Sequence, residues 1–171
     1  MDLQQFEITI LPLKNKVYRL AKTLLGDVTE AEDAVQDIYL KLWSVRAELD
    51  KADNITGFVL HIARNYCVDK LRQQPNIQYD VLSTSEHVIE NQSNELSPYE
   101  RTEQRDMVSA VKRLIEQLPE QQRIVIHLRD VEGMEMNEIV HITGLTENAI
   151  KVYLSRARQR IRESLTKQII D

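Results

Sequence analysis

The stretch "MNEIVHITGLTENAIKVYLS", residues 136–155, decides the fold of this chain. Apolar residues with helical spacing lie on both sides of Gly144, and a tight turn there needs a positive φ angle that only glycine adopts at little cost. Leu145 has the size to fill the angle between the two helices, and Thr146 is a suitable N-cap for the second. The pattern predicts a helix-turn-helix.

The second helix of this motif has two contrasting faces. Its apolar stripe and its opposite, mainly basic stripe both have spacings of four, three and four: Ile150, Leu154, Ala157, Ile161 and Lys151, Ser155, Arg158, Arg162. A DNA-reading helix needs this division, because one side docks on its module while the N-terminal half enters the major groove. A solvated basic face is the alternative, and the preceding turn favours DNA binding.

Charge is distributed unevenly along the 171 residues. Residues 150–171 hold six basic side chains against two acids, a local charge of +4, although the whole chain carries −5; residues 1–149 therefore carry −9. Nucleic acid is attracted by one end and repelled by the average surface. This excludes a wholly basic coat protein and leaves a site-specific DNA binder.

Composition places the chain among soluble globular proteins, with 42% hydrophobic and 29% charged residues. The N-terminus lacks the basic and apolar segments of a signal peptide, and no apolar run approaches the roughly 18 residues of a membrane helix. The single Cys67 cannot form an internal disulfide. We expect a cytoplasmic protein without membrane insertion.

Three helices are expected in the N-terminal part, and they cover about residues 3–25, 29–46 and 55–73. Pro12 marks a break in the first helix or its late start, and Gly26 ends it. Thr29, with Glu32 three residues later, has the spacing of a capping box at the start of the second. Residues 47–54, "AELDKADN", predict a polar loop before the third.

Residues 75–98 change in character, because Ser, Asn, Gln and Glu dominate and no periodicity holds. This composition predicts a linker. Helices are expected beyond it over about 99–117 and from Pro119 to about Gly133, the latter lined by Ile124, Val125, Leu128 and Val131. The expected fold is all-α: a three-helix domain over 1–74, the linker over 75–98, and a four-helix domain over 99–171.

Two parts of the chain resemble bacterial sigma factors. "GDVTEAEDAVQDIYLKLW" (26–43) and "GFVLHIARNYCVDKLR" (57–72) resemble region two, and residues 118–165, which contain the helix-turn-helix, resemble region four. Two helical domains with no further region are similar to the extracytoplasmic-function (ECF) group. The resemblance implies a subunit that binds core RNA polymerase and directs promoter-specific transcription initiation. It implies no enzymatic activity, cofactor or metal.

The same resemblance implies the partners. They are the coiled coil of the largest polymerase subunit, the flap of the second-largest subunit, promoter DNA and an anti-sigma factor. The helix face assigned to polymerase comprises Asp33, Gln36, Asp37, Leu40 and Trp43. A tryptophan beside two acids suits an interface; burial of Trp43 under the first helix is the alternative.

Residues for the two promoter elements are likewise implied by the resemblance. The third helix offers His61, Arg64, Asn65 and Arg72 to the minus-ten element. Sites for single-stranded DNA favour aromatic platforms, but the preceding loop has none, so no base-capture residue is assigned. An ordinary surface or interface histidine is the alternative for His61. The minus-thirty-five element is assigned Lys151, Val152, Ser155 and Arg156, with Tyr153 and Arg158 as phosphate contacts.

Two other functions remain as alternatives. A helix-turn-helix regulator with a sensory N-terminal domain would bind DNA tightly without polymerase. An enzyme has little support, because His61, His87, His127 and His141 are scattered and fit no metal-ligand or catalytic spacing. Cys67 lies in an apolar helix and is predicted to be a buried, inert thiol rather than a nucleophile.

Overall fold

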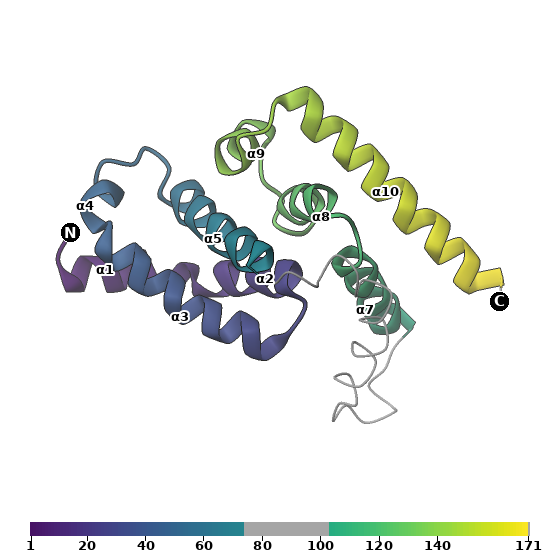
Figure 1. Cartoon of the computed structure of the whole chain (residues 1–171), viewed down its shortest axis with the longest axis horizontal. Helices are drawn as coiled ribbons and strands as arrows, with labels where there is room; N and C mark the ends of the chain where they lie inside the picture. The colour runs from purple at the N-terminus through teal and green to yellow at the C-terminus, as the bar shows by residue number, and fades with distance from the viewer. Residues whose placement is uncertain (74–102, 171) are drawn as a thin grey trace.

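The computed structural model describes residues 1–73 and 103–170, and within these ranges the chain is all-α, as predicted (Figure 1). The predicted linker, residues 75–98, lies outside the described residues. The N-terminal half comprises α1 (Leu3–Thr9), a 3₁₀ turn (Leu11–Leu13), α2 (Lys14–Leu25), α3 (Val28–Ser44), α4 (Arg46–Leu49) and α5 (Ile55–Arg72). The C-terminal half comprises α7 (Glu103–Glu116), α8 (Glu120–Ile126), a π-helical turn (His127–Val131), α9 (Met136–Thr143) and α10 (Glu147–Ile170).

Helix boundaries in the N-terminal half follow local chemistry. Pro12 lies in the 3₁₀ turn that separates α1 from α2, and Gly26 ends α2 with φ +75°, so both predicted breaks are confirmed. The predicted capping box at Thr29 is wrong. Asp27 is the N-cap of α3, because its carboxylate directly follows the glycine and accepts from the Thr29 amide at 3.2 Å, which places Thr29 within the first turn.

The predicted polar loop over 47–54 contains a short helix that the sequence did not indicate. Helix α4 is held by Leu49, which is fully buried among the N-terminal helices. Asn54 then caps α5 by accepting from the Gly57 amide at 2.9 Å. A single apolar residue is too weak a periodic signal to predict so short a helix. Burial of Leu49 in the tertiary structure stabilises α4.

The core of the N-terminal half forms where α2, α3 and α5 meet. On α3, Ala34, Ile38 and Leu42 are buried at helical spacing, whereas the C-cap Val45 is only half-buried. Cys67 is fully buried on α5, and burial raises the pKa of its thiol to about 12. The thiolate is therefore scarce at neutral pH, in agreement with the predicted inert thiol.

The helix-turn-helix is confirmed in its local geometry. Gly144 has φ +74° and ends α9, and the hydroxyl of Thr146 accepts from the Ala149 amide at 3.1 Å at the start of α10. The predicted apolar stripe of α10 is buried throughout: Ile150, Leu154, Ala157 and Ile161. The prediction that Val131 is buried is wrong, because the chain widens into a π-helical turn over 127–131, which changes the 3.6-residue register and leaves Val131 exposed.

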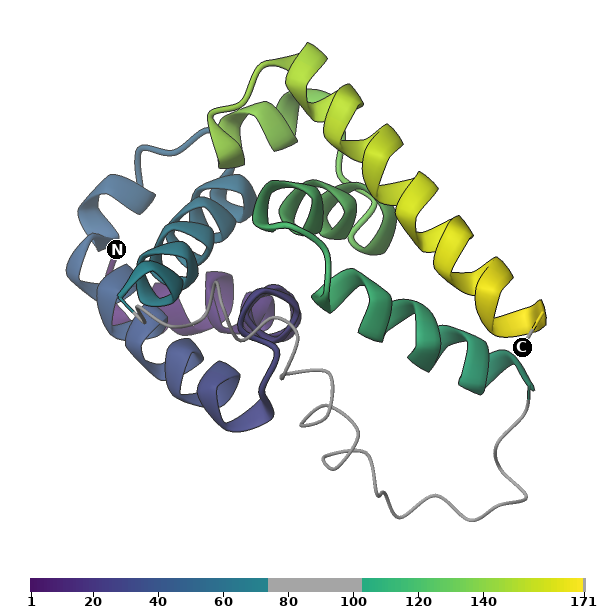
Figure 2. The same cartoon turned by 45° about the vertical axis from the view of Figure 1, so that its right-hand side comes forward.

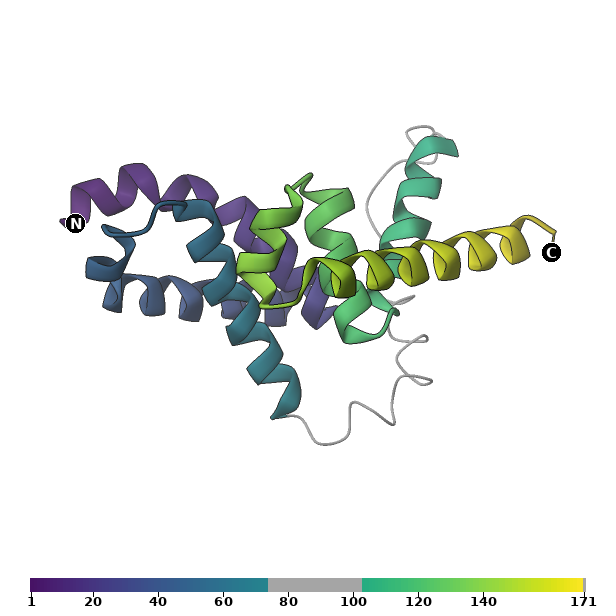
Figure 3. The same ribbon diagram turned by 90° about the horizontal axis from the view of Figure 1, so that it is seen from above.

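The two halves pack against each other in the described parts of the chain. Helix α5 lies against α9, and α2 lies against α7 and α8 (Figures 1 and 2). Helix α10 extends along the C-terminal half and projects beyond it (Figure 3). None of the described helices is long and apolar enough to cross a lipid bilayer.

Replacement of Gly144 by alanine should destabilise the helix-turn-helix through backbone strain alone. A Cβ added there meets no atom within 4 Å, so no side-chain collision contributes. A left-handed conformation costs a non-glycine residue about 1–2 kcal/mol, and Asn tolerates it better than Ala. We expect Gly144→Ala to lower the free energy of unfolding by about that amount and Gly144→Asn by less, measured by urea denaturation followed by circular dichroism. Equal losses for the two variants would contradict this explanation.

Candidate functional site

Helix α10 presents five of the six residues predicted for the minus-thirty-five element to solvent. Lys151, Val152, Ser155, Arg156 and Arg158 are exposed, and Val152 has 46% of its surface accessible. Tyr153 is half-buried and packs against the core. The apolar stripe beneath them fixes the helix on its module, which is the arrangement that a DNA-reading helix requires.

The exposed residues of α10 differ in their surroundings. Lys151, Ser155 and Arg158 line a groove of about 900 Å³ that is bounded on its other sides by α7 and the π-helical turn, where Val111 and Val131 contribute apolar surface. Val152 and Arg156 lie outside this groove, so they are the more openly presented pair.

Arg158 is held in place by a residue that the sequence did not reveal. Its Nε and Nη2 donate to the two carboxylate oxygens of Asp130 at 3.0 and 2.7 Å, and this hydrogen bonding, together with the carboxylate charge, raises the pKa of Arg158. Asp130 lies in the π-helical turn, 28 positions earlier in the chain. No spacing rule connects two such distant positions, so only the packing of α10 against this turn could identify the pair.

Lys151 also has an acidic neighbour, since its Nζ lies 3.3 Å from Glu147, one turn earlier on the same helix. Both side chains are well exposed, and such surface pairs contribute little to stability. The ion pair therefore leaves Lys151 available to another partner.

Three of the four residues predicted for the minus-ten element form a chain of hydrogen bonds on α5. Arg64 Nη1 donates to Asn65 Oδ1 at 2.9 Å, and Asn65 Nδ2 lies 3.1 Å from His61 Nε2. His61 Nδ1 lies 2.9 Å from the carbonyl oxygen of Ile142 in α9. Because a carbonyl only accepts, Nδ1 carries the proton and Nε2 accepts from Asn65, which defines a neutral tautomer. Arg72 is separate and exposed at the end of α5.

The structure thus places His61 at a contact between the two halves of the molecule. Its ring is half-buried and is engaged on both nitrogens. This is the arrangement expected of an interface histidine, the alternative noted from the sequence.

Four of the residues predicted to bind polymerase form an exposed face on α3. Asp33, Gln36, Asp37 and Leu40 are all accessible, and Leu40 has 69% of its surface exposed. The hydroxyl of Tyr66 in α5 donates to Asp37, which ties this face to the core. A single exposed leucine is common on protein surfaces, so the assignment of this face to polymerase stays a prediction.

Trp43 differs from the other four. Its ring lies edge-on to Phe6 of α1, with 5.2 Å between ring centroids, and the guanidinium of Arg46 stacks 4.2 Å from its centroid. It is half-buried. The contact with Phe6 holds α1 against α3, in line with the alternative in which Trp43 packs under the first helix.

In residues 1–73 and 103–170, no group of three or more His, Cys, Asp or Glu side chains is arranged to hold a metal ion.

Models of known protein families match both halves of the chain. The sigma-70 region 2 model matches residues 10–76, and the sigma-70 region 4 model matches residues 109–161. The ECF RNA polymerase sigma factor SigW of Bacillus subtilis is 24% identical over 157 residues, 89% of this chain and 84% of that protein. The ECF RNA polymerase sigma-E factor of Escherichia coli is 26% identical and covers 94% of this chain and 86% of its own length.

Solved structures agree with this fold. The sigma factor RpoE from Bartonella quintana, in complex with the anti-sigma factor NepR, superposes with a TM-score of 0.73 at 24% identity over 96% of this chain and 98% of that chain. CnrH, in complex with the cytosolic domain of CnrY, superposes with a TM-score of 0.66 at 19% identity. With both family regions present in order and ECF proteins matching nearly the whole length, the chain belongs to the sigma-70 family, in its ECF group.

Proposed function

We propose that this chain binds core RNA polymerase and directs it to specific promoters to initiate transcription. The observation that carries the proposal is the combination of two surfaces on one chain. One is the exposed acidic and apolar face of α3, and the other is the basic, solvent-facing side of α10 above a buried apolar stripe. A regulator that acts without polymerase needs the second surface but has no use for the first.

The residues divide by role. Asp33, Gln36, Asp37 and Leu40 form the polymerase face, and Trp43 supports it from beneath. On α10, Lys151, Val152, Ser155 and Arg156 approach the base edges of the minus-thirty-five element, where Val152 is suited to a thymine methyl group. Tyr153 and Arg158 contact phosphates. The minus-ten element is met by His61, Arg64, Asn65 and Arg72 on α5.

The remaining assignments follow from this role. A region-two domain over 1–74 and a region-four domain over 99–171 are joined by a linker over 75–98. The partners are the coiled coil of the largest polymerase subunit, the flap of the second-largest subunit, promoter DNA and an anti-sigma factor. The chain acts in the cytoplasm as a binding subunit and not as an enzyme, as the sigma factors it resembles do.

The direct test is reconstituted transcription. Purified core polymerase with this protein should produce transcripts from defined start sites on a library of genomic fragments, while core polymerase alone does not. Absence of any specific transcript, in a reaction where a control sigma factor works, would contradict the proposal. Tight DNA binding without polymerase would then favour the regulator.

Arg156→Ala should weaken promoter recognition without affecting polymerase binding. Arg156 is exposed on α10, and loss of one good base contact costs about 1–3 kcal/mol, or roughly 5- to 150-fold. We expect a loss of transcription in that range, with unchanged affinity for core polymerase measured by fluorescence anisotropy. Arg160→Ala is the matched control, because Arg160 is an equally basic, exposed residue beyond the expected groove contact. An equal loss for both variants would indicate a general charge effect.

Asp37→Arg should have the reverse effect and weaken association with core polymerase by at least about tenfold, because it places a cation where the docking face carries acids. The substitution also removes the acceptor of the Tyr66 hydroxyl. Tyr66→Phe removes the same hydrogen bond and keeps Asp37, so it serves as the control and should bind polymerase as the wild type does. Unchanged association of Asp37→Arg would show that another face docks.

A further inference from the structure

Arg158 differs from the other arginines of α10. Arg156, Arg160 and Arg162 are exposed and form no ion pair with a described residue, whereas Arg158 is bound at two points by Asp130. The two hydrogen bonds engage Nε and Nη2, which form one edge of the guanidinium. A planar guanidinium that is held by two parallel bonds loses most of its freedom to rotate. The orientation of this one cation is therefore set before any ligand arrives.

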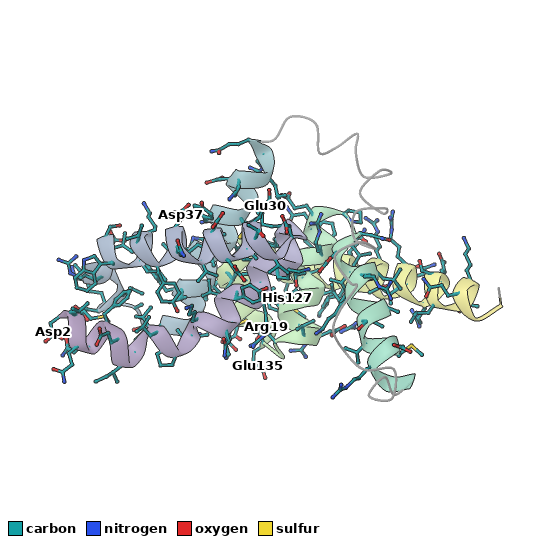
Figure 4. The ribbon with its side chains drawn as sticks, turned by 90° about the horizontal axis from the view of Figure 1, so that it is seen from below. Asp2, Arg19, Glu30, Asp37, His127 and Glu135 are labelled. Carbon is teal, nitrogen blue, oxygen red and sulfur yellow. The ribbon has the colours of Figure 1, made fainter. Side chains whose placement is uncertain are left out.

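Asp130 is itself held in place by the π-helical turn to which it belongs. His127, the first residue of the turn, is buried in the interior of the molecule (Figure 4). Its carbonyl accepts from the amide of Glu132 at 3.0 Å, which closes the turn. Arg129 Nη1 donates to the carbonyl of Met134 at 2.7 Å and ties the turn to the chain that follows it. A buried start and these closing bonds give Asp130 a defined position at the surface.

The opposite edge of the Arg158 guanidinium remains open. Nη1 of Arg158 has no partner among the described residues, and 48% of the side chain is exposed. The N–H donors of a guanidinium point outward in one plane, so two oxyanions can bind to two different edges of it. Arg158 can therefore keep Asp130 on one edge and receive a phosphate oxygen on the other, without breaking the pair.

An acid beside a DNA-facing cation can act in two opposite ways: it can compete with the phosphate, or it can orient the cation toward it. The pair of Lys151 with Glu147 has no orienting geometry, because it rests on one contact of 3.3 Å between two side chains that are each 60% exposed. A lysine ammonium also has no plane that an acid could fix. The pair of Arg158 with Asp130 has two short bonds and a free edge, which is the geometry that orients.

We propose that Asp130 is a positioning residue for promoter recognition, which holds Arg158 with its open edge toward a phosphate of the minus-thirty-five element. The inference rests on the proposed function, in which Arg158 contacts a phosphate. An arginine that is ordered beforehand loses less conformational freedom on binding, and this corresponds to about 2- to 10-fold in affinity. The charge of Asp130 repels the same phosphate and offsets part of that gain. The role of Asp130 is therefore measured by its coupling to Arg158 and not by its removal alone.

A double-mutant cycle separates orientation from charge. Core polymerase is reconstituted with the wild type, Asp130→Ala, Arg158→Ala or the double variant, and affinity is measured by fluorescence anisotropy on a promoter fragment taken from the transcription assay. Removal of the Asp130 carboxylate relieves its repulsion of DNA whether or not Arg158 is present, so this effect cancels in the cycle. We expect Asp130→Ala to be less favourable for DNA affinity, by about 2- to 10-fold, when Arg158 is present than when it is absent.

Conservative variants and a matched pair serve as controls. Asp130→Glu keeps a carboxylate that can bind Nε and Nη2, so it should restore the coupling that Asp130→Ala removes. Arg158→Lys keeps the charge but cannot be held in one plane, so in this background Asp130→Ala should show no unfavourable coupling. The same cycle with Glu147→Ala and Lys151→Ala tests an acid and a base of the same helix without two-point geometry, and we expect no unfavourable coupling there either.

The proposal is overturned if the coupling between Asp130 and Arg158 is zero or has the opposite sign. Zero coupling, with a lower free energy of unfolding in urea for each single variant, would mean that the pair only fastens α10 to the π-helical turn. The opposite sign would mean that Asp130 competes with DNA for Arg158. If Asp130→Ala lowers the helix content, Asp130→Asn replaces it, because it keeps the shape of the side chain and loses the charge and one acceptor.

A measurement on the free protein does not depend on transcription. The Nε–H group of Arg158 should be ordered in nuclear magnetic resonance relaxation of the wild type and should become mobile in Asp130→Ala. A mobile Nε–H in the wild type would overturn the proposal, because the cation would then not be held in advance. Failure of the proposed function is a separate result, since it appears as absence of transcription by the wild type even when Arg158 is ordered.

Discussion

The packing of α5 is the constraint on which the rest of the molecule depends. One side of this helix is buried against α2 and α3 through residues such as Val59, Ala63 and Cys67, which form the core of the N-terminal half. Another side carries His61 against the last turn of α9. A single helix therefore fixes the polymerase face on α3, offers the residues assigned to the minus-ten element, and positions the helix-turn-helix relative to both.

Acidic side chains organise the basic ones in this molecule. The chain carries −5 overall, yet the surface of α10 that we assign to promoter DNA relies on arginine and lysine. Asp130 holds Arg158 in a two-point geometry, Glu132 holds Arg19, and Glu116 holds Lys22. Two of these three pairs join residues in different halves. Carboxylates thus set the orientation of cations, and in doing so they also hold region four on region two.

The polar contacts between the two halves can be replaced by contacts with a charged partner. Exposed ion pairs and polar interdomain contacts contribute little net stability in water. A DNA backbone or a polymerase surface is a stronger competitor for the same groups, because it offers many charges at once. Binding of either polymerase or DNA can therefore break these polar contacts, and the side chains that are set free can then contact the other partner.

The sequence by itself determined the local structure. Gly26 and Gly144 ended helices where positive φ angles were required, Pro12 broke the first helix, and the apolar stripe of α10 was buried at every predicted position. These features depend on neighbours within about four residues in the sequence. Rules for periodicity and capping use the same short range and therefore predict them. Local rules failed where burial or register departed from the regular helix, as with Leu49 in α4 and Val131 after the π-helical turn.

Pairing between distant segments was decided only by the tertiary structure. Asp130 with Arg158, Arg19 with Glu132, and His61 with the carbonyl of Ile142 join positions 28, 113 and 81 residues apart. The sequence favoured an interface for Trp43 over packing under α1, and the structure shows its ring in contact with Phe6 of α1. The physical reason is that a charge or a ring can pair with many partners of suitable chemistry, and only the packing of whole helices selects one.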